Sequence, residues 1–228
     1  MQSTLKHRIH LAIIMDGNRR WAAGRGLGHG QGHEAGAEAL RRIVQAAPDH
    51  GIATLTVYAF ASENWRRPVE ETAAMMALFR RYLDSETEAL VRDGVRLSVI
   101  GRRDRLGDQL VGEIERSEAA TEWGDSMHLR LAVDYSARAA ILEAARKVGR
   151  NTSAEEFAAS LNGESGDVDF LIRTGNDHRL SDFLLWECAY AELYFTPCLW
   201  PDFGEKDLAE ALDDFHRRAR AAGVARAA

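Results

Sequence analysis

Cysteine, proline and long apolar runs are all scarce in this chain of 228 residues. The two cysteines, Cys188 and Cys198, are too few for a four-ligand zinc set or a disulfide framework, so we predict two packing residues in a reducing compartment. Only four prolines, beside 46% hydrophobic residues, exclude a disordered or collagen-like chain, because such chains lack apolar surface to bury. We therefore expect a globular protein.

The chain also lacks a net positive charge, since 29 basic residues against 35 acidic ones leave −6. It should not bind nucleic acid nonspecifically, and any anionic ligand must be held by a local basic cluster. Apolar runs such as residues 11–15 are far shorter than the about 20 residues that cross a bilayer. Residues 1–8 lead into no secretion signal. We expect a cytoplasmic protein without a transmembrane segment, and peripheral membrane contact stays open.

What is present is a regular alternation of strand-like and helix-like segments. Strands are predicted at residues 9–15, 54–60, 95–100, 129–133, 168–172 and 193–195. Helices are predicted at residues 32–51, 68–92, 106–121, 139–148, 154–161 and 206–219. No linker rich in proline, glycine or serine interrupts them. This alternation favours an α/β fold in which residues 1–228 form a single domain, with a central, mainly parallel six-stranded sheet flanked by helices.

Three segments that follow predicted strands combine hydrogen-bond acceptors with arginines: residues 16–21, 61–67 and 173–181. Ligands of parallel α/β sheets bind beyond the carboxyl ends of the strands. In the first segment Asp16 and two arginines precede a series of glycines that leads to His33 at the mouth of a helix. Such a loop can cradle a phosphate, but a flexible surface loop with solvated arginines has the same glycine spacing.

The third segment brings a second basic cluster, with Arg173, Arg179 and the hydroxyl of Ser181, which suits a diphosphate. Oxygen and imidazole ligands for a hard divalent cation could come from Asp16, His178 and Glu192. The alternatives are surface ion pairs of the arginines with neighbouring aspartates and a structural role for the histidine. A set of apolar residues near these segments is either core or the wall of a hydrocarbon tunnel: Trp21, Phe60, Trp65, Met75, Met76, Phe79, Phe183, Leu184, Leu185 and Trp186.

Six sequence stretches, taken together, closely resemble the cis-prenyltransferases, the undecaprenyl diphosphate synthase family. They are residues 10–18, 32–36, 58–65, 171–175, 179–186 and 189–195, and the resemblance runs from about residue 9 to residue 215. It implies an enzyme, a prenyltransferase that transfers alkyl groups other than methyl. It also implies a homodimer, isoprenyl diphosphate substrates and Mg²⁺ as the cofactor.

The resemblance assigns roles to individual positions. Asp16, Asn64 and His33 would be catalytic, with Asp16 serving Mg²⁺ and the departure of diphosphate. The diphosphate of the allylic donor would be held by Gly17, Asn18, Arg19, Arg20 and His33, with Trp21 among the substrate-binding residues. Ser62, Asn64, Trp65 and Arg67 would line the reaction centre. Arg173, Arg179 and Ser181 would hold the diphosphate of the second substrate, and Asp16, Glu192 and His178 would be the metal positions.

Departures from the family pattern gather around the second substrate. Asn176 and Asp177 stand where the family commonly has Gly and Glu, and Ser136 and Ala137 stand within its Asn-Tyr-Gly-Gly-Arg motif, whose first residue here is Asp134. His29 replaces a basic residue, and the C-terminal Arg-x-Gly aligns with residues 221–223, where alanine replaces the arginine. These changes favour a specialised short-chain product, with head-to-middle coupling of the lavandulyl type as one form of it.

Two other functions stay open at this point. One is the regular head-to-tail synthesis of a Z-polyprenyl diphosphate from isopentenyl diphosphate. The other is a catalytically silent binding subunit. Against it argue the intact residues Asp16, His33, Asn64, Arg173, Arg179, Ser181 and Glu192.

Overall fold

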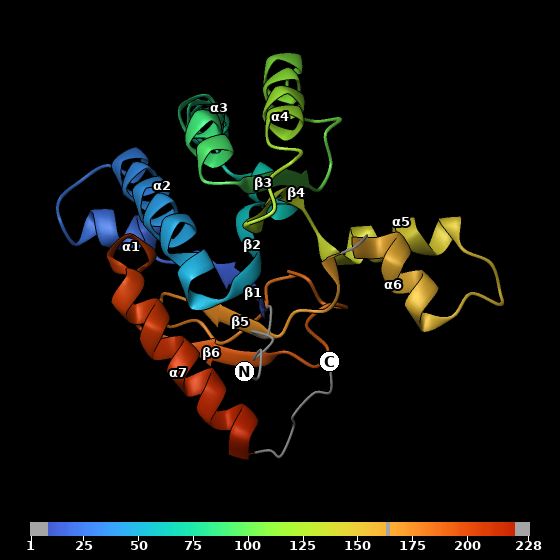
Figure 1. Ribbon diagram of the computed structural model, residues 1–228. Helices are drawn as coiled ribbons and strands as arrows, with labels where there is room; N and C mark the ends of the chain where they lie inside the picture. The colour runs from blue at the N-terminus through green and yellow to red at the C-terminus, as the bar shows by residue number, and fades with distance from the viewer. Residues whose placement is uncertain (1–8, 163–164, 222–228) are drawn as a thin grey trace.

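The computed structural model describes residues 9–162 and 165–221, which are built around one six-stranded sheet (Figure 1). The strands are β1 (Ile9–Ile14), β2 (Ile52–Ala61), β3 (Val95–Ile100), β4 (Met127–Tyr135), β5 (Phe170–Arg173) and β6 (Glu192–Phe195). Their order is β3-β4-β2-β1-β5-β6, and every neighbouring pair is parallel. The predicted α/β fold with a parallel sheet is confirmed.

Seven α-helices accompany the sheet within the described ranges: α1 (Asn18–Ala23), α2 (His29–Ala46), α3 (Val69–Arg92), α4 (Asp108–Ala120), α5 (Ala137–Lys147), α6 (Ala154–Asn162) and α7 (Glu205–Ala221). Short 3-10 helices are η1 (Ala47–His50), η2 (Ser62–Arg66) and η4 (Trp200–Asp202). The sequence did not predict α1, because six residues are too few to show a helical period. α2 begins three residues before the predicted start, and η1, which contains Pro48, follows it.

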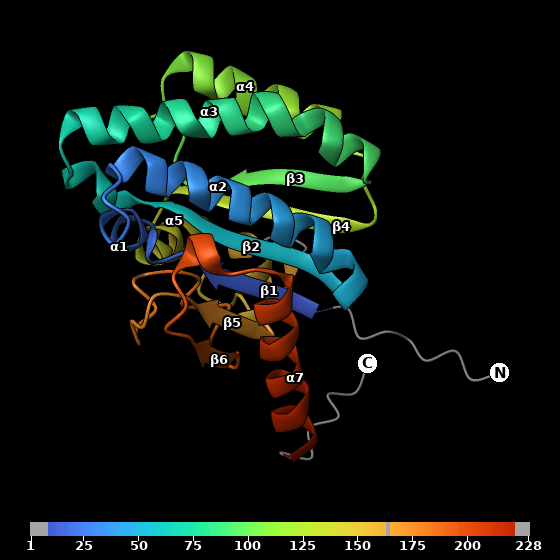
Figure 2. The ribbon, with the colours of Figure 1, turned by 90° about the vertical axis from the view of Figure 1, so that its left-hand side faces the viewer.

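Alternate residues of the strands enter two different cores. Leu11 and Ile13 of β1 pack in the larger cluster with α2, α3, α4 and α7, whereas Ala12 and Ile14 face a smaller cluster with α5 and residues 180–188. This period of two is what a parallel sheet covered on both faces requires. Figure 2 shows α2, α3 and α4 stacked along one side of the sheet, with the strand arrows pointing toward α1. The carboxyl ends of the strands therefore meet at the edge where α1 lies.

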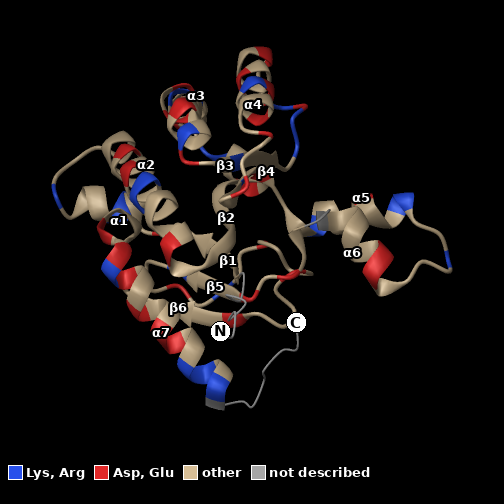
Figure 3. Cartoon of the chain, viewed as in Figure 1, with Lys and Arg blue, Asp and Glu red and all other residues tan. Residues whose placement is uncertain are grey.

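Basic and acidic residues are mixed along the helices (Figure 3). On α3, Glu70 and Glu71 open the first turn and Arg92 closes the last, an order that suits the helix dipole. No helix among the described residues is long and apolar enough to cross a membrane.

The sheet face that carries the smaller cluster, with Ala12 and Ile14, is polar at one end. There His10 of β1 is only 4% exposed, and its ring nitrogens contact the hydroxyl of Thr56 at 2.8 Å and the carbonyl of Asp167 at 3.1 Å. On β4, His128 contacts Ser98 at 2.8 Å and Arg96 at 3.1 Å. Burial, together with the charge of Arg130, lowers the pKa of His10 to about 4. This histidine is therefore neutral at pH 7.

We expect the stability of the protein to fall as the pH drops from 6.5 toward 4. Over this window the unfolded chain protonates His10 while the folded chain does not, so the free energy of unfolding decreases with falling pH. A shift from 6.5 to about 4 corresponds to about 3 kcal/mol in full, of which about 2 kcal/mol is lost between pH 7.0 and 4.5. Urea unfolding at pH 7.0 and 4.5 measures it. In His10→Gln the difference between the two pH values should shrink by about that amount; an unchanged difference would show that His10 is not its source.

Candidate active site

The backbone of the first loop is fixed by its neighbours. Gly17 has φ of +114°, and a Cβ there would lie 3.0 Å from the Cα of Leu199, so only glycine fits. The carbonyl of Asp16 accepts hydrogen bonds from the Thr174 hydroxyl at 2.7 Å and the Trp200 amide at 3.0 Å. These contacts hold Asp16 just beyond the carboxyl end of β1, with 28% of its side chain exposed.

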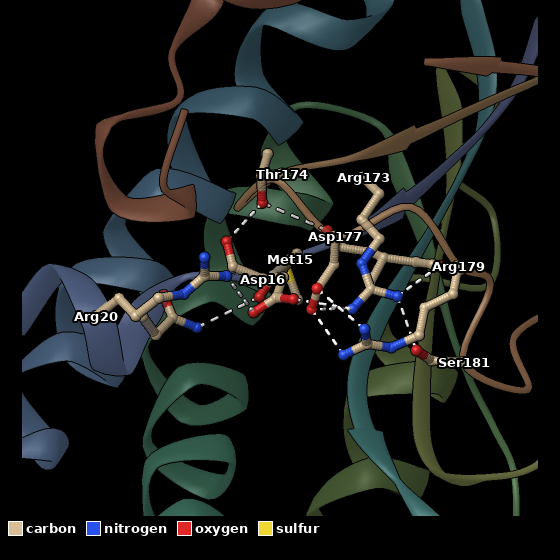
Figure 4. Close-up of polar contacts among 10 residues, drawn as sticks. Met15, Asp16, Arg20, Arg173, Thr174, Asp177, Arg179 and Ser181 are labelled. Carbon is tan, nitrogen blue, oxygen red and sulfur yellow. Dashed lines mark hydrogen bonds and ion pairs between the residues drawn. The ribbon is translucent and has the colours of Figure 1, made fainter. Parts of the chain in front are cut away.

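Arg173, the last residue of β5, is the centre of the polar contacts in this loop cluster (Figure 4). Its side chain is 4% exposed, and its Nη2 donates to the carboxylates of Asp16 at 2.9 Å and Asp177 at 3.0 Å. Its Nη1 donates to the Ser181 hydroxyl at 2.7 Å and to the carbonyl of Arg179 at 2.5 Å. Arg173 thus holds Asp16 and the loop of residues 177–181 at once.

Asp177 joins the two arginines predicted to bind the second diphosphate. It accepts hydrogen bonds from Arg179 at 2.7 and 3.0 Å in addition to the bond from Arg173. The ion pairs that the sequence offered as the alternative to a diphosphate site are therefore present. Arg179 remains 65% exposed, and it lines the same cavity as Arg173 and Ser181, so it is accessible to a ligand.

Replacing Arg173 with methionine should cost both stability and activity. The change leaves two carboxylates close together without the cation between them, and breaking such a buried pair costs about 3–5 kcal/mol. Turnover should fall about 100-fold or more, since Asp16 loses the closer of its two arginine hydrogen-bond donors and keeps only Arg20. Arg179→Met is the matched control, because its exposed guanidinium adds little to stability. A midpoint of unfolding equal to that of the control would contradict the structural part of this expectation.

Helix α1 packs closely against α2. This packing brings Asn18 and His33 to the same cavity as Asp16. A Cβ at Gly32 would lie 2.3 Å from the carbonyl of Asn18, and one at Gly36 would lie 2.5 Å from its side-chain oxygen. Burial, and then the charge of Arg67, lower the pKa of His33, so its imidazole is neutral at pH 7. Its Nε2 is buried and has no hydrogen-bond partner among the described residues.

Two cavities adjoin at this point. A polar cavity of about 530 Å³ is lined by the predicted residues Asp16, Gly17, Asn18, Arg19, Arg20, His33, Asn64, Arg67, Arg173, Arg179 and Ser181. An apolar cavity of about 100 Å³ lies between α2, α3 and the sheet, lined in part by Ala37, Leu40, Phe79, Tyr82 and Leu131. Met15, Asn18, His33, Ala59 and Met75 line both. The arrangement suits an amphipathic ligand with an anionic head and an apolar tail.

Three predicted substrate-binding residues do not line the polar cavity. The Ser62 hydroxyl donates to the buried carboxylate of Asp134 at 2.7 Å, and the Trp65 ring packs edge-on against Phe60 with centroids 5.1 Å apart. Trp21 of α1 donates its indole N–H to the carboxylate of Asp202, in η4, at 2.7 Å. These side chains support the site from outside, and their roles in substrate binding stay predictions.

Glu71, which no sequence motif singled out, pairs with two arginines of the polar cavity. Its carboxylate accepts a hydrogen bond from Arg67 at 2.9 Å and lies 3.9 Å from Arg19. The spacing of four residues from Arg67 on a helix is the signal that could have found it.

The three predicted metal positions, Asp16, Glu192 and His178, do not form one cluster among the described residues. Glu192 is the first residue of β6, level with Phe170, so it lies at the opposite edge of the sheet from Asp16 and is 3.6 Å from Arg218 of α7. His178 stacks on Phe195 with centroids 4.8 Å apart. Among the described residues, no group of three or more His, Cys, Asp or Glu side chains could hold a metal. The acidic groups that converge are Asp16 and Asp177.

Such a pair still fits Mg²⁺, because this ion is usually bound by one or two carboxylates together with phosphate oxygens of the substrate. Its role as the cofactor stays a prediction.

The remaining departures have local explanations or lie at the end of the chain. Ser136 caps α5, accepting from the Ala139 amide at 3.2 Å, and it donates to Asp182. His29 begins α2. Ala221 is the last residue of α7, and residues 222–223 of the aligned Arg-x-Gly motif lie outside the described residues.

A family model for undecaprenyl diphosphate synthase matches residues 14–223, which is nearly the whole chain. The chain belongs to the undecaprenyl diphosphate synthase family. It is therefore a prenyltransferase, as the sequence predicted.

Relatives of the chain within this family carry three different names. Isoprenyl transferase 1 of Bradyrhizobium diazoefficiens is 58% identical over 98% of this chain and 94% of its own length. The (2E,6E)-farnesyl-diphosphate-specific ditrans,polycis-undecaprenyl-diphosphate synthase of Pectobacterium atrosepticum is 45% identical over 94% of this chain and 89% of its own. The structure resembles lavandulyl diphosphate synthase from Lavandula x intermedia in complex with dimethylallyl diphosphate, with a TM-score of 0.87 and 34% identity over 92% and 95% of the two chains.

Proposed function

We propose that this protein is a regular cis-prenyl diphosphate synthase, which extends an allylic diphosphate with isopentenyl diphosphate. The observation that carries the proposal is the junction of the polar and apolar cavities at Met15, Asn18, His33, Ala59 and Met75. An allylic diphosphate would place its head among the arginines and its hydrocarbon tail between α2 and α3. The names of the two enzyme relatives, isoprenyl transferase and undecaprenyl-diphosphate synthase, support this function over a specialised short-chain product.

The reaction joins two isoprenyl units and releases one diphosphate. The bond between C1 of the allylic donor and its diphosphate oxygen breaks, C1 bonds to C4 of isopentenyl diphosphate, and a proton leaves C2 to form the new Z double bond. Negative charge develops on the departing diphosphate, where Arg19, Arg20 and Arg67 line the cavity. The neutral His33 stands at the border with the apolar cavity, which keeps water from the allylic cation.

Asp16, with Asp177 beside it, would hold Mg²⁺ against the diphosphates, and the ion would supply further positive charge for the leaving group. We include in the proposal that the enzyme acts in the cytoplasm as a homodimer.

A lavandulyl-type synthase is the second candidate, because the structure of such an enzyme superposes closely on this chain. In that reaction an allylic diphosphate replaces isopentenyl diphosphate as the acceptor. The departures at Asp177 and Ser136 border the second-substrate loop, since Asp177 pairs with Arg179 and Ser136 with Asp182.

Product analysis separates the two reactions. The enzyme is incubated with dimethylallyl, geranyl or farnesyl diphosphate, each with and without ¹³C-labelled isopentenyl diphosphate, and the products are read by mass spectrometry. We expect labelled five-carbon increments that require isopentenyl diphosphate. A ten-carbon product from dimethylallyl diphosphate alone would establish head-to-middle coupling instead. Absence of any product from all mixtures would identify a silent subunit.

A further inference from the structure

A buried carboxylate, Asp134, lies behind the candidate active site at the end of β4. Its side chain is fully buried, and it pairs with Arg105, whose Nε donates to one carboxylate oxygen at 2.8 Å and whose Nη2 contacts the other. The oxygen bound by Nη2 also accepts the Ser62 hydroxyl at 2.7 Å. Asp134 lines a cavity on the far side of the η2 turn and not the polar cavity of the site. It therefore cannot touch a substrate bound there.

Arg105 supports the same turn at a second point. Its guanidinium carbon lies 5.6 Å from the centre of the Trp65 ring, and that ring also packs against Phe60. The η2 turn, Ser62–Arg66, is thus held from behind at its first residue and near its last. On its other side Asn64 and the following Arg67 line the polar cavity. The position of these two side chains depends on how the turn is held.

The backbone at Asp134 is unusual in a way that helps the test. Its φ is +49°, a conformation that aspartate and asparagine adopt more easily than other residues with a side chain. Asp134→Asn therefore removes the charge without adding backbone strain. An alanine at this position would remove the charge and add strain, so its effect would be ambiguous.

We propose that Asp134 and Arg105 are positioning residues for prenyl transfer: through Ser62 and Trp65 they fix the η2 turn that presents Asn64 and Arg67 to the reaction centre. The inference rests on the proposed function, since it concerns the same cavity. Displacement of a reacting or orienting group by about 1 Å can lower a rate about 100-fold. Asp16, Arg20 and Arg173 come from other elements, and their mutual contacts stay in place.

The test measures kcat and KM of Asp134→Asn, Arg105→Met and the double variant, well below their unfolding temperatures. We expect kcat to fall about 10- to 100-fold in each single variant while KM for both diphosphates changes less than about threefold. The double variant should be no slower than the slower single variant, because both changes release the same turn. Arg105→Lys keeps one charged contact and should restore part of kcat. Glu118→Gln, which breaks the nearby pair of Arg103 and Glu118, is the matched control and should keep wild-type kinetics.

Three results would overturn the proposal: unchanged kcat, a loss carried by KM, or losses that multiply in the double variant. If Asp134→Asn does not fold, Ser62→Ala provides the measurement, and its kcat should fall about 3- to 10-fold at unchanged KM. Failure of the proposed function is distinguishable, because wild-type enzyme would then give no product that contains isopentenyl diphosphate label. If wild-type enzyme is active and these variants are equally active, only the positioning role is wrong.

Discussion

Asp16→Asn should lower turnover by about 1,000-fold or more while the protein stays folded. The carboxylate lines the polar cavity, accepts a hydrogen bond from Arg173 at 2.9 Å and lies 3.3 Å from Arg20. Asparagine keeps the size of the side chain but removes the charge needed beside a departing diphosphate and its cation. Single-turnover measurements with saturating allylic and isopentenyl diphosphates would report the loss in the chemical step itself.

Stability should change little in this variant. The carbonyl of Asp16, which fixes the loop to Thr174 and Trp200, is retained, and Arg173 keeps Asp177 and Ser181 as partners. Asp104→Asn is a suitable control, because its exposed carboxylate pairs with Arg102 and does not line the polar cavity. Turnover of Asp16→Asn within tenfold of wild type would contradict the assignment, and loss of its thermal transition would show that the residue acts on folding.

The sequence predicted the sheet. Most of the substrate-binding residues it suggested line the polar cavity, whereas Trp21, Ser62 and Trp65 do not. Period-two patterns in β1 and β4, with Asp16 and Arg173 at strand ends, suffice because parallel strands bring their carboxyl ends to one edge. The helical pattern of apolar residues did not reveal α1, because six residues show no period. It also missed the first three residues of α2, which lie among glycines.

Contacts between side chains from distant parts of the chain were beyond prediction. No local pattern shows that Ser62 bonds Asp134, 72 residues away, or that Asp177 joins Arg173 to Arg179. Nor does the sequence show that Glu192 is the first residue of β6 and so lies at the amino ends of the strands, away from Asp16. Residue types in a motif indicate the chemistry of a site, whereas register and loop geometry decide which of them meet.

Charge balance in the polar cavity indicates why a divalent cation should be needed. Five arginines line it, namely Arg19, Arg20, Arg67, Arg173 and Arg179, against the three carboxylates of Asp16, Glu63 and Asp177. His33 adds no charge at pH 7, because burial lowers its pKa. The resulting excess is at most two positive charges, and Glu71, which pairs with Arg19 and Arg67, lowers it further. This excess is smaller than the negative charge of two neighbouring diphosphates. Part of that charge would remain uncompensated in a site where charges repel more strongly than in water.

Removal of divalent metal should therefore stop the reaction. With EDTA and metal-free substrates we expect turnover to fall about 1,000-fold, since a metal beside a phosphoryl group is worth several kcal/mol. Added Mg²⁺ should restore it, whereas sodium chloride at equal ionic strength should not. Asp177→Asn should raise the Mg²⁺ concentration needed for half-maximal rate if its carboxylate helps Asp16 to hold the ion, because Mg²⁺ prefers charged oxygen ligands. Full turnover in chelator would show that the arginines alone stabilise the leaving diphosphate.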